Sequence, residues 1–256
     1  VKATLQVFNW GRLAAHDSKL LDKYLSKTGV HDVGEPISED LETLIARRID
    51  HLTAFQDEAW AQKYVTVVEK VRSAEKAAGL GGDLKVTEEV ARYLSKLMSY
   101  KDEYEVARLY SAPEFRERLD QTFEGDYKLK VQMAPPLIAR PRKKGGEPQK
   151  IEFGPWIFPL LKFMAKFKTL RGGTFDIFGY SAERKMERRL IEEYIEMIEG
   201  LLPRLNAGTQ ADIAAIAALP DMVKGYGHIK DENVVLYEAE KTKLIAALDT
   251  PAKDVA

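Results

Sequence analysis

The sequence has no cysteine among its 256 residues. This absence excludes a disulfide framework, a zinc site with thiolate ligands and an iron–sulfur cluster held by the chain's own thiolates. Long apolar runs are also missing, because the longest, from Phe153 to Leu161, contains two prolines and ends at Lys162. A helix that crosses a bilayer needs about 20 apolar residues. We therefore expect no membrane partner and, because no secretory signal is recognisable, a cytoplasmic location.

The chain carries little net charge, since 39 basic and 40 acidic side chains leave a formal charge of −1. Hydrophobic residues make up 45% and charged residues 31%, the balance of a folded globular protein rather than a disordered one. The length fits one large domain or two modest ones. The chain begins at Val1 instead of methionine, so we expect a processed chain or a piece of a longer protein.

Apolar residues recur at helical spacing through most of the sequence. This periodicity predicts helices over 9–26, 41–52, 57–78, 87–110, 113–123, 156–168, 183–202 and 231–248. We expect the 87–110 pattern to form one long helix. Ser181 is expected to cap the clearest helix, and Thr209 with Asp212 has the spacing of a capping box.

One stretch in the middle departs from the helical pattern. Apolar and polar residues alternate over 129–133, which is the period of a half-buried strand. Residues 151–153 are expected to form the returning strand of a long hairpin. The predicted fold class is therefore mainly α, with a small β-hairpin around 127–153. We expect a helical domain over 39–256, preceded by a separate terminal segment over 1–38.

Charge is divided unevenly between two neighbouring segments. Residues 100–126 hold eight acids and four bases, whereas residues 127–171 hold eleven bases and two acids. An exposed basic loop is expected over 140–150, with its cations at Arg140, Arg142, Lys143 and Lys144. Such a separation generates a field that steers an oppositely charged partner. The favoured alternative is that the acidic segment covers the basic one within the fold.

Tyr100, Tyr104 and Arg108 are spaced four apart, so on one helix they share a face. The guanidinium of Arg108 can then stack on Tyr104 and meet an anionic substrate or a neighbouring domain. The alternative, which we favour, is a partly buried helix whose polar face is solvated.

The segment Phe178-Gly179-Tyr180 leads into the Ser181 cap and makes Tyr180 and Arg184 candidates for contact with a ligand or another domain. Glycine before a helix N-terminus can bring backbone N–H groups close to an anion. A glutamate in the first turn opposes a second negative charge, so a structural helix entry is the favoured interpretation. Arg184 is expected to pair with Glu187 on the helix.

Residues 225–228 read Gly-Tyr-Gly-His, and a G-x-G without a preceding strand is weak evidence for dinucleotide binding. His228 has no carboxylate or cysteine partner at metal-ligand spacing. General acid–base work by His228 is therefore less favoured than a tight structural turn. The sequence assigns no catalytic residue and no metal ligand.

Four stretches, in order, resemble one enzyme family. They are KLMSYKDEYEVARLY (96–110), FEGDYKLKVQMAPPLIAR (123–140), GPWIFPLLKFMAKFKTLRGGTFDIFGYSAERKMERRLIEEY (154–194) and VKGYGHIKDEN (223–233). Together they are similar to the C-terminal domain of the bacterial fused indolepyruvate:ferredoxin oxidoreductases, members of the 2-oxoacid:ferredoxin oxidoreductase superfamily. The opening NWGRLAA, within the terminal segment over 1–38, resembles the end of the preceding γ-type acceptor domain.

The resemblance implies an enzyme that oxidatively decarboxylates aryl 2-oxoacids to acyl-CoA. In that family, thiamine diphosphate and magnesium support the decarboxylation, and an iron–sulfur cluster passes electrons to ferredoxin. The diphosphate site, with its Gly-Asp-Gly loop, belongs to another domain, and this sequence has no Gly-Asp-Gly. The resemblance therefore implies a chain that binds none of these cofactors itself. Its expected partners are the catalytic and γ-type domains, with ferredoxin as a further acidic partner.

Two other hypotheses remain open. One is an independent enzyme or small-molecule-binding domain that uses Tyr104, Arg108 and His228. The other is a nucleic-acid binder through residues 140–171, where aromatic side chains are interspersed with lysines and arginines. Nucleic-acid binding is the least favoured of the three.

Overall fold

A computed structural model describes residues 8, 11–12, 16, 40–125, 127–133 and 150–249. The chain separates into two units, Val1–Asp40 and Leu41–Ala256. The fold described below is that of the second unit. The predicted helix over 9–26 lies largely outside the described residues. The expected cations of the basic loop lie wholly outside them: Arg140, Arg142, Lys143 and Lys144.

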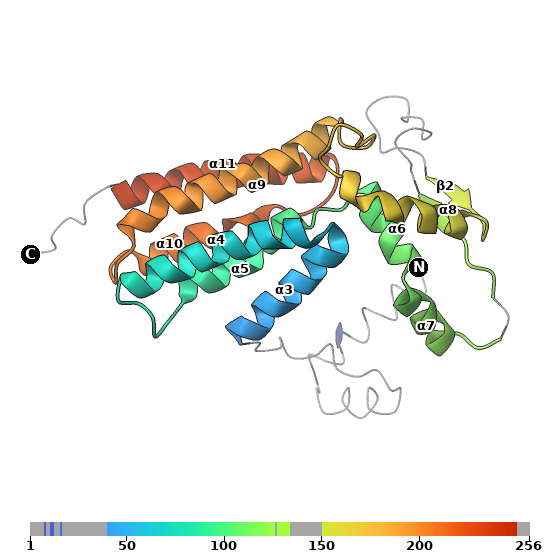
Figure 1. Ribbon diagram of the computed structural model, residues 1–256, viewed down its shortest axis with the longest axis horizontal. Coiled ribbons are helices and arrows are strands. Elements are labelled where there is room, and N and C mark those ends of the chain that lie inside the picture. Colours follow the sequence, from blue (N-terminus) through green and yellow to red (C-terminus); the bar gives the residue numbers. More distant parts are fainter. Residues whose placement is uncertain are drawn as a thin grey trace, which may run out of the picture. The chain divides into compact units, whose positions relative to one another are not determined.

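Between residues 40 and 249, the described part of the chain forms nine α-helices, three 3-10 helices and a two-stranded sheet (Figure 1). The predicted fold class, mainly α with a small β-hairpin, is confirmed. The α-helices are α3 (Leu41–Phe55), α4 (Glu58–Ala77), α5 (Lys85–Met98), α6 (Glu103–Ser111), α7 (Pro113–Thr122), α8 (Ile157–Met164), α9 (Ala182–Leu201), α10 (Gln210–Ala218) and α11 (His228–Asp249). The 3-10 helices are η1 (Ala165–Leu170), η2 (Leu202–Arg204) and η3 (Leu219–Met222).

The antiparallel sheet pairs β1 (Val131–Met133) with β2 (Ile151–Phe153), and Gln132 lies opposite Glu152. Both strands fall where the sequence predicted them. None of the helices in the described ranges has the length and apolar character of a membrane span.

Six helices form a bundle around the larger of two hydrophobic cores. Helix α5 packs against α3, α4, α9 and α10, and α11 packs against α10 and η3. An ion pair between Lys230 and Glu187 links α11 to α9. The buried rings of Tyr64 and Tyr194 donate their hydroxyl hydrogens to the carbonyls of Ala91 and Ala217. Each buried hydroxyl therefore has a partner, without which its burial would cost about 1–3 kcal/mol.

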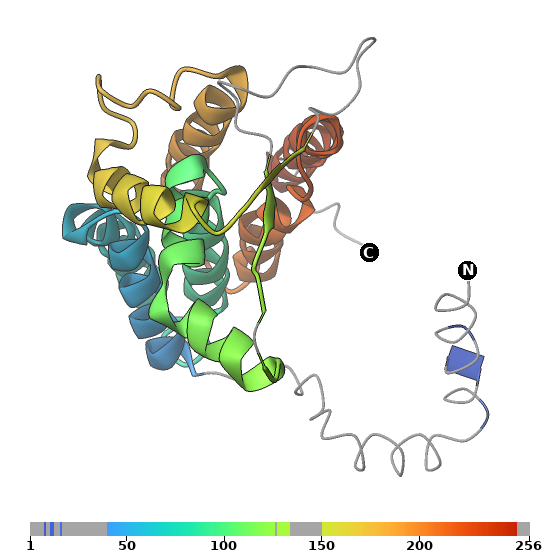
Figure 2. The ribbon, with the colours of Figure 1, turned by 90° about the vertical axis from the view of Figure 1, so that its right-hand side faces the viewer.

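A second, smaller core lies between α6, α8 and the sheet. Its buried members are Ala107, Val131, Ile157 and Leu161. Helix α6 packs against both α8 and η1. Figure 1 shows α6, α7 and α8 grouped at one end of the bundle, and Figure 2 views the molecule from that end. The two connections between the cores are the segments 99–102 and 171–181, and these segments carry the polar network described below.

The predicted single helix over 87–110 is wrong, because the chain forms α5 and α6 with a break between them. Ser99 Oγ bonds back to a carbonyl in the last turn of α5. Asp102 then starts α6 by accepting the N–H of Glu105 at 2.8 Å. Side chains that bond to the backbone in this way compete with continued helix. The break carries α6 out of the bundle and into the smaller core.

The predicted caps have different outcomes. Ser181 caps α9 as expected, with its hydroxyl accepting the N–H of Arg184 at 3.2 Å. The capping box at Thr209 is wrong, because that hydroxyl donates to the carbonyl of Arg204 at 2.7 Å and makes no cap bond to α10. The helix predicted over 156–168 is α8 continued by the tighter η1.

Candidate interaction surface

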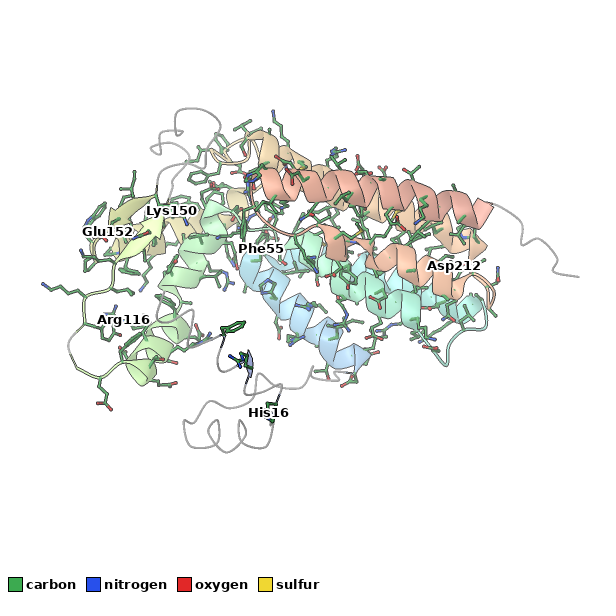
Figure 3. The ribbon with its side chains drawn as sticks, turned by 180° about the vertical axis from the view of Figure 1, so that it is seen from behind. His16, Phe55, Arg116, Lys150, Glu152 and Asp212 are labelled. Carbon is green, nitrogen blue, oxygen red and sulfur yellow. The ribbon has the colours of Figure 1, made fainter. Side chains whose placement is uncertain are left out.

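A buried ion pair between Arg171 and Asp102 joins the two cores. Their side chains are 1% and 2% exposed. Nε and Nη2 of Arg171 donate to the two carboxylate oxygens at 2.5 and 2.9 Å. Nη1 donates to the carbonyl of Phe55 at 2.6 Å, and the guanidinium lies 3.6 Å from the centroid of the Phe55 ring. The pair therefore holds the end of α3, where Figure 3 labels Phe55, against the start of α6.

Lys168 adds a second cation at the end of α3. Its Nζ donates to the carbonyls of Thr53 and Ala54 at 3.1 and 2.7 Å. Cations stabilise a helix C-terminus, where unbonded carbonyls carry partial negative charge. Burial lowers the pKa of Lys168. This side chain holds η1 to α3 and belongs to the structural network.

Asp176 organises the loop between η1 and α9, residues 172–180, which we name the display loop. The buried carboxylate accepts the N–H groups of Gly172, Phe178 and Gly179 at 2.8, 3.2 and 3.0 Å. A Cβ added to Gly179 would lie 2.3 Å from Oδ2 of Asp176, so this position requires glycine. The loop is thus held in one conformation by a carboxylate of its own chain.

Tyr104 supports the display loop from α6. Its ring packs edge-on against Phe178, with ring centroids 5.2 Å apart. Burial first, and then the charge and hydrogen bond of Asp176, raise the pKa of Tyr104 to about 12. Tyr104 is therefore a neutral hydroxyl at physiological pH, placed close to the carboxylate that holds the loop.

The display loop carries large apolar side chains on its outer side. Phe175, Ile177 and Tyr180 are 77%, 62% and 61% exposed. The hydroxyl of Tyr180 donates to the carbonyl of Thr174 at 2.7 Å, which restricts the ring. Exposed apolar side chains on a fixed backbone are typical of contact sites for other proteins, because little conformational entropy remains to be lost on binding.

A second exposed apolar set, the aromatic stripe, precedes the display loop on α8 and η1. Trp156, Leu160, Phe163 and Phe167 recur at helical spacing and are all exposed. The rings of Phe163 and Phe167 meet edge-on at 5.0 Å, whereas the opposite side of α8 is buried in the smaller core. Of the fourteen exposed large hydrophobic side chains among the described residues, seven lie within 156–180.

Lys162 and Lys166 are exposed beside the aromatic stripe. The sequence suggested that the acidic segment, residues 100–126, covers the basic segment, residues 127–171. Among the described residues, one ion pair supports this interpretation. Within the described ranges, Arg171–Asp102 is the only ion pair that joins residues 100–126 to residues 127–171. Most of the described basic segment therefore keeps its cations in solvent or, at Lys168, on backbone carbonyls.

The structure brings three of the predicted site residues to the junction of the cores. Tyr100, Tyr104 and Arg184 are all buried there. The guanidinium of Arg184 lies 5.6 Å from the Tyr100 ring and donates to the carbonyl of Lys101. The expected pair with Glu187 is present at 2.7 Å. These side chains support the junction from inside, and they are not the exposed contacts that the sequence interpretation considered.

The less favoured interpretation, in which Arg108 stacks on Tyr104, does not hold in the structure. Arg108 instead donates to both carboxylate oxygens of Glu105 at 2.8 and 2.7 Å, because the three-residue spacing places a bidentate partner on the same helix. The guanidinium over the Tyr104 ring belongs to Arg171, at 5.6 Å. Tyr100 precedes the helix start and so does not share a helical face with Arg108.

The interpretation of the Gly179 N–H as a site for an external anion is also wrong, because Asp176 already accepts that N–H. His228 is exposed and begins α11 after a turn in which Gly225 and Gly227 have φ of +93° and +55°. No hydrogen bond or ion pair in the described structure links the His228 side chain to Tyr104 or Arg108. The described ranges contain no group of three or more His, Asp and Glu residues placed to hold a metal ion.

Sequence reasoning missed the three residues that build the junction, Asp102, Arg171 and Asp176. In the sequence Arg171 is followed by two glycines, a pattern that by itself indicates only a break after a helix. One signal was available, since Asp176 stands between apolar residues and is followed by a glycine three positions later. Charged residues in such surroundings are typical of carboxylates that bond to a local backbone turn.

Searches of the curated proteins and of the solved structures each find no match to this chain. A family model does match, over residues 41–243, which is most of the sequence and includes the junction, the aromatic stripe and the display loop. The description of that family assigns it no activity. The chain belongs to the family of unknown function DUF6537.

Proposed function

We propose that this chain is a structural and interfacial domain of a thiamine-diphosphate-dependent aryl-2-oxoacid (indolepyruvate):ferredoxin oxidoreductase, located in the cytoplasm. Other domains of that enzyme carry out the oxidative decarboxylation. The identity of the parent enzyme is supported by the four sequence stretches that resemble its C-terminal domain. The interfacial role is supported by the apolar residues that this domain exposes over 156–180.

The observation that carries the interfacial role is the contrast between the two sides of one segment. On its inner side, the Arg171–Asp102 pair and the Asp176 carboxylate hold the backbone. On its outer side, the aromatic stripe and the display loop leave large apolar groups in water. Burying one such side chain in a contact stabilises it by roughly 1.5–3 kcal/mol, so a few of them suffice to hold a neighbouring domain.

The proposal assigns thiamine diphosphate, magnesium and the iron–sulfur cluster to other parts of the enzyme. The family resemblance places the diphosphate loop in another domain, and a chain without cysteine has no thiolate for a cluster. The partners proposed for this chain are the catalytic and γ-type domains.

The test compares two double variants of the chain. Trp156→Ser with Phe163→Ser changes the aromatic stripe. Val235→Ser with Leu236→Ser changes two α11 residues that are similarly exposed, at 68% and 57%. Each tagged variant is mixed with separately expressed thiamine-binding and γ-type domains of an indolepyruvate:ferredoxin oxidoreductase, and co-purification and indolepyruvate-dependent reduction of methyl viologen are measured.

We expect the unaltered chain and the α11 variant to co-purify with those domains, and the stripe variant to lose at least about tenfold in affinity, which corresponds to 1.4 kcal/mol. The isolated chain is expected to reduce no viologen. Turnover by the isolated chain, or equal co-purification of all three forms, would overturn the proposal.

A further inference from the structure

A groove of about 440 Å³ opens between the α6–α7 elbow and the start of α8. Tyr110, Pro113 and Phe115 line its first wall, and Phe158 and Pro159 line the second. The rings of Tyr110 and Phe115 meet edge-on with centroids 5.3 Å apart. The elbow is fixed because Ala112 is extended and Pro113 begins α7. The groove is thus an aromatic and proline-lined site with defined walls.

Two cations stand at this groove, one on each wall. Arg116 comes from α7, where Figure 3 labels it, and Lys162 comes from α8. Both side chains are exposed, and no acidic residue is among those that line the groove. Neither cation forms an ion pair with another residue of the described ranges. The groove therefore combines an apolar floor with positive charge on both sides.

We propose that this groove binds an acidic segment of a partner protein. An apolar side chain of that segment enters between the aromatic rings, and its flanking carboxylates pair with Arg116 and Lys162. Charge complementarity of this kind sets specificity and speeds association more than it adds raw affinity. The inference goes beyond the proposed function, because none of the exposed apolar side chains of the aromatic stripe lines the groove.

A protein segment fits this groove better than a nucleic acid does. Single-stranded nucleic acid needs exposed ring faces for base stacking, whereas Tyr110, Phe115 and Phe158 are each only partly exposed. Helix α7 also carries three acids beside its two bases. These acids repel a continuous run of phosphates more strongly than they repel a short segment with only a few carboxylates.

The experiment measures fluorescence anisotropy of labelled twelve-residue peptides with the whole chain. The first peptide carries Phe and Leu anchors flanked by Glu and Asp. A second peptide carries the same anchors flanked by Lys and Arg, and a third keeps the acids but replaces the anchors by Ser. A labelled single-stranded oligonucleotide tests whether the groove binds nucleic acid instead. The groove variant is Arg116→Glu with Lys162→Glu, and the matched control is Lys185→Glu, an exposed charge reversal on α9.

We expect the acidic anchored peptide to bind at low salt, to lose affinity as salt rises, and to bind the groove variant at least about tenfold more weakly. Lys185→Glu is expected to leave binding within about twofold. Backbone amide shifts in the NMR spectrum should move for Tyr110, Phe115 and Phe158. Thermal melting of the groove variant shows whether it is folded.

Failure of the acidic peptide to bind, equal binding of the basic peptide, or tighter binding of the oligonucleotide would each overturn this inference. Because the assay uses only the isolated chain and peptides, its outcome is separate from co-purification with thiamine-binding domains. A negative result in the peptide assay therefore does not contradict the proposed function, and a negative co-purification result does not contradict the peptide-binding groove.

Discussion

The guanidinium of Arg171 and the carboxylate of Asp102 form two parallel hydrogen bonds beneath the surface, although 69 residues separate them in sequence. Asp102 also caps α6 by accepting the N–H of Glu105. One carboxylate thus sets both the direction of α6 and the path of the chain after η1. The exposed apolar side chains over 156–180 depend on this pair for their position.

The first prediction concerns the cost of breaking this pair. Arg171→Met leaves the Asp102 carboxylate buried without its counter-charge, and removing one partner of a buried pair costs about 3–5 kcal/mol. Asp102→Ser keeps a good N-cap residue but leaves the buried Arg171 guanidinium without its counter-charge. Urea unfolding at pH 7 should show a loss of this size for each single variant.

The double variant Arg171→Met with Asp102→Ser is the control for the pair itself. Neither charge remains, so the double variant should lose clearly less stability than the two single losses together, with a coupling of about 1–3 kcal/mol. Additive losses would show that the two side chains act independently. Arg108→Met tests the Arg108–Glu105 pair of α6, in which the two side chains are 25% and 7% exposed. We expect a smaller loss than for Arg171→Met, because Arg108 is in contact with water.

Much of the helical architecture follows from local pattern. Ser181 begins α9 where the sequence predicted, and the alternation over 129–133 locates β1. These features depend on residues within one turn or one strand of each other, so a single sequence contains their signal. The break at 99–102 was missed because an apolar face at helical spacing continues across it.

The junction could not be predicted from sequence, because its contacts span large separations. The buried Glu75 is a second example, since its carboxylate accepts the N–H groups of Val86 and Thr87 at 2.9 Å and the amide of Gln210 from α10. A glutamate inside an amphipathic helix has no local feature that distinguishes this role. Its partners become visible only when α4, α5 and α10 are packed together.

The second prediction concerns Asp176 and the display loop. Asp176→Ala removes the side-chain acceptor for three backbone N–H groups, of which that of Gly179 is buried. A buried donor left without a partner costs about 1–3 kcal/mol. We expect faster hydrogen exchange at Gly172, Phe178 and Gly179, with the amides of α5 and α9 unchanged. Far-UV circular dichroism should retain its helical signal, because the bundle core does not include this loop.

The variant Tyr104→Phe distinguishes the contribution of Tyr104 to the display loop from that of the backbone hydrogen bonds to Asp176. It removes the hydroxyl whose pKa Asp176 raises but keeps the ring that packs on Phe178. Exchange at Gly179 should rise less in this variant than in Asp176→Ala. Equal exchange in both variants would mean that Tyr104, rather than the carboxylate's own backbone bonds, holds the loop.

The third prediction concerns the pH dependence of stability at Glu103, the first residue of α6. Its Oε2 is buried without a hydrogen-bond partner. Burial raises the pKa of Glu103 above its ordinary 4.5, with Asp102 and Glu183 adding to the rise and Arg184 opposing it. A raised folded-state pKa means that the folded state holds this proton more tightly than the unfolded state does.

The protonated Glu103 carboxyl therefore contributes to the free energy of unfolding. This contribution is fully present below pH 4.5 and is lost as pH rises through the higher folded-state pKa. Above that folded-state pKa the ionised carboxylate lies in a partly buried place, which Glu103→Gln relieves. We expect Glu103→Gln to raise Tm at pH 7 and to lose that advantage as pH falls toward 4. Glu58→Gln, at an exposed position in the first turn of α4, is the matched control. A Tm difference for Glu103→Gln that stays constant from pH 4 to pH 7 would show that the change acts through packing instead of ionisation.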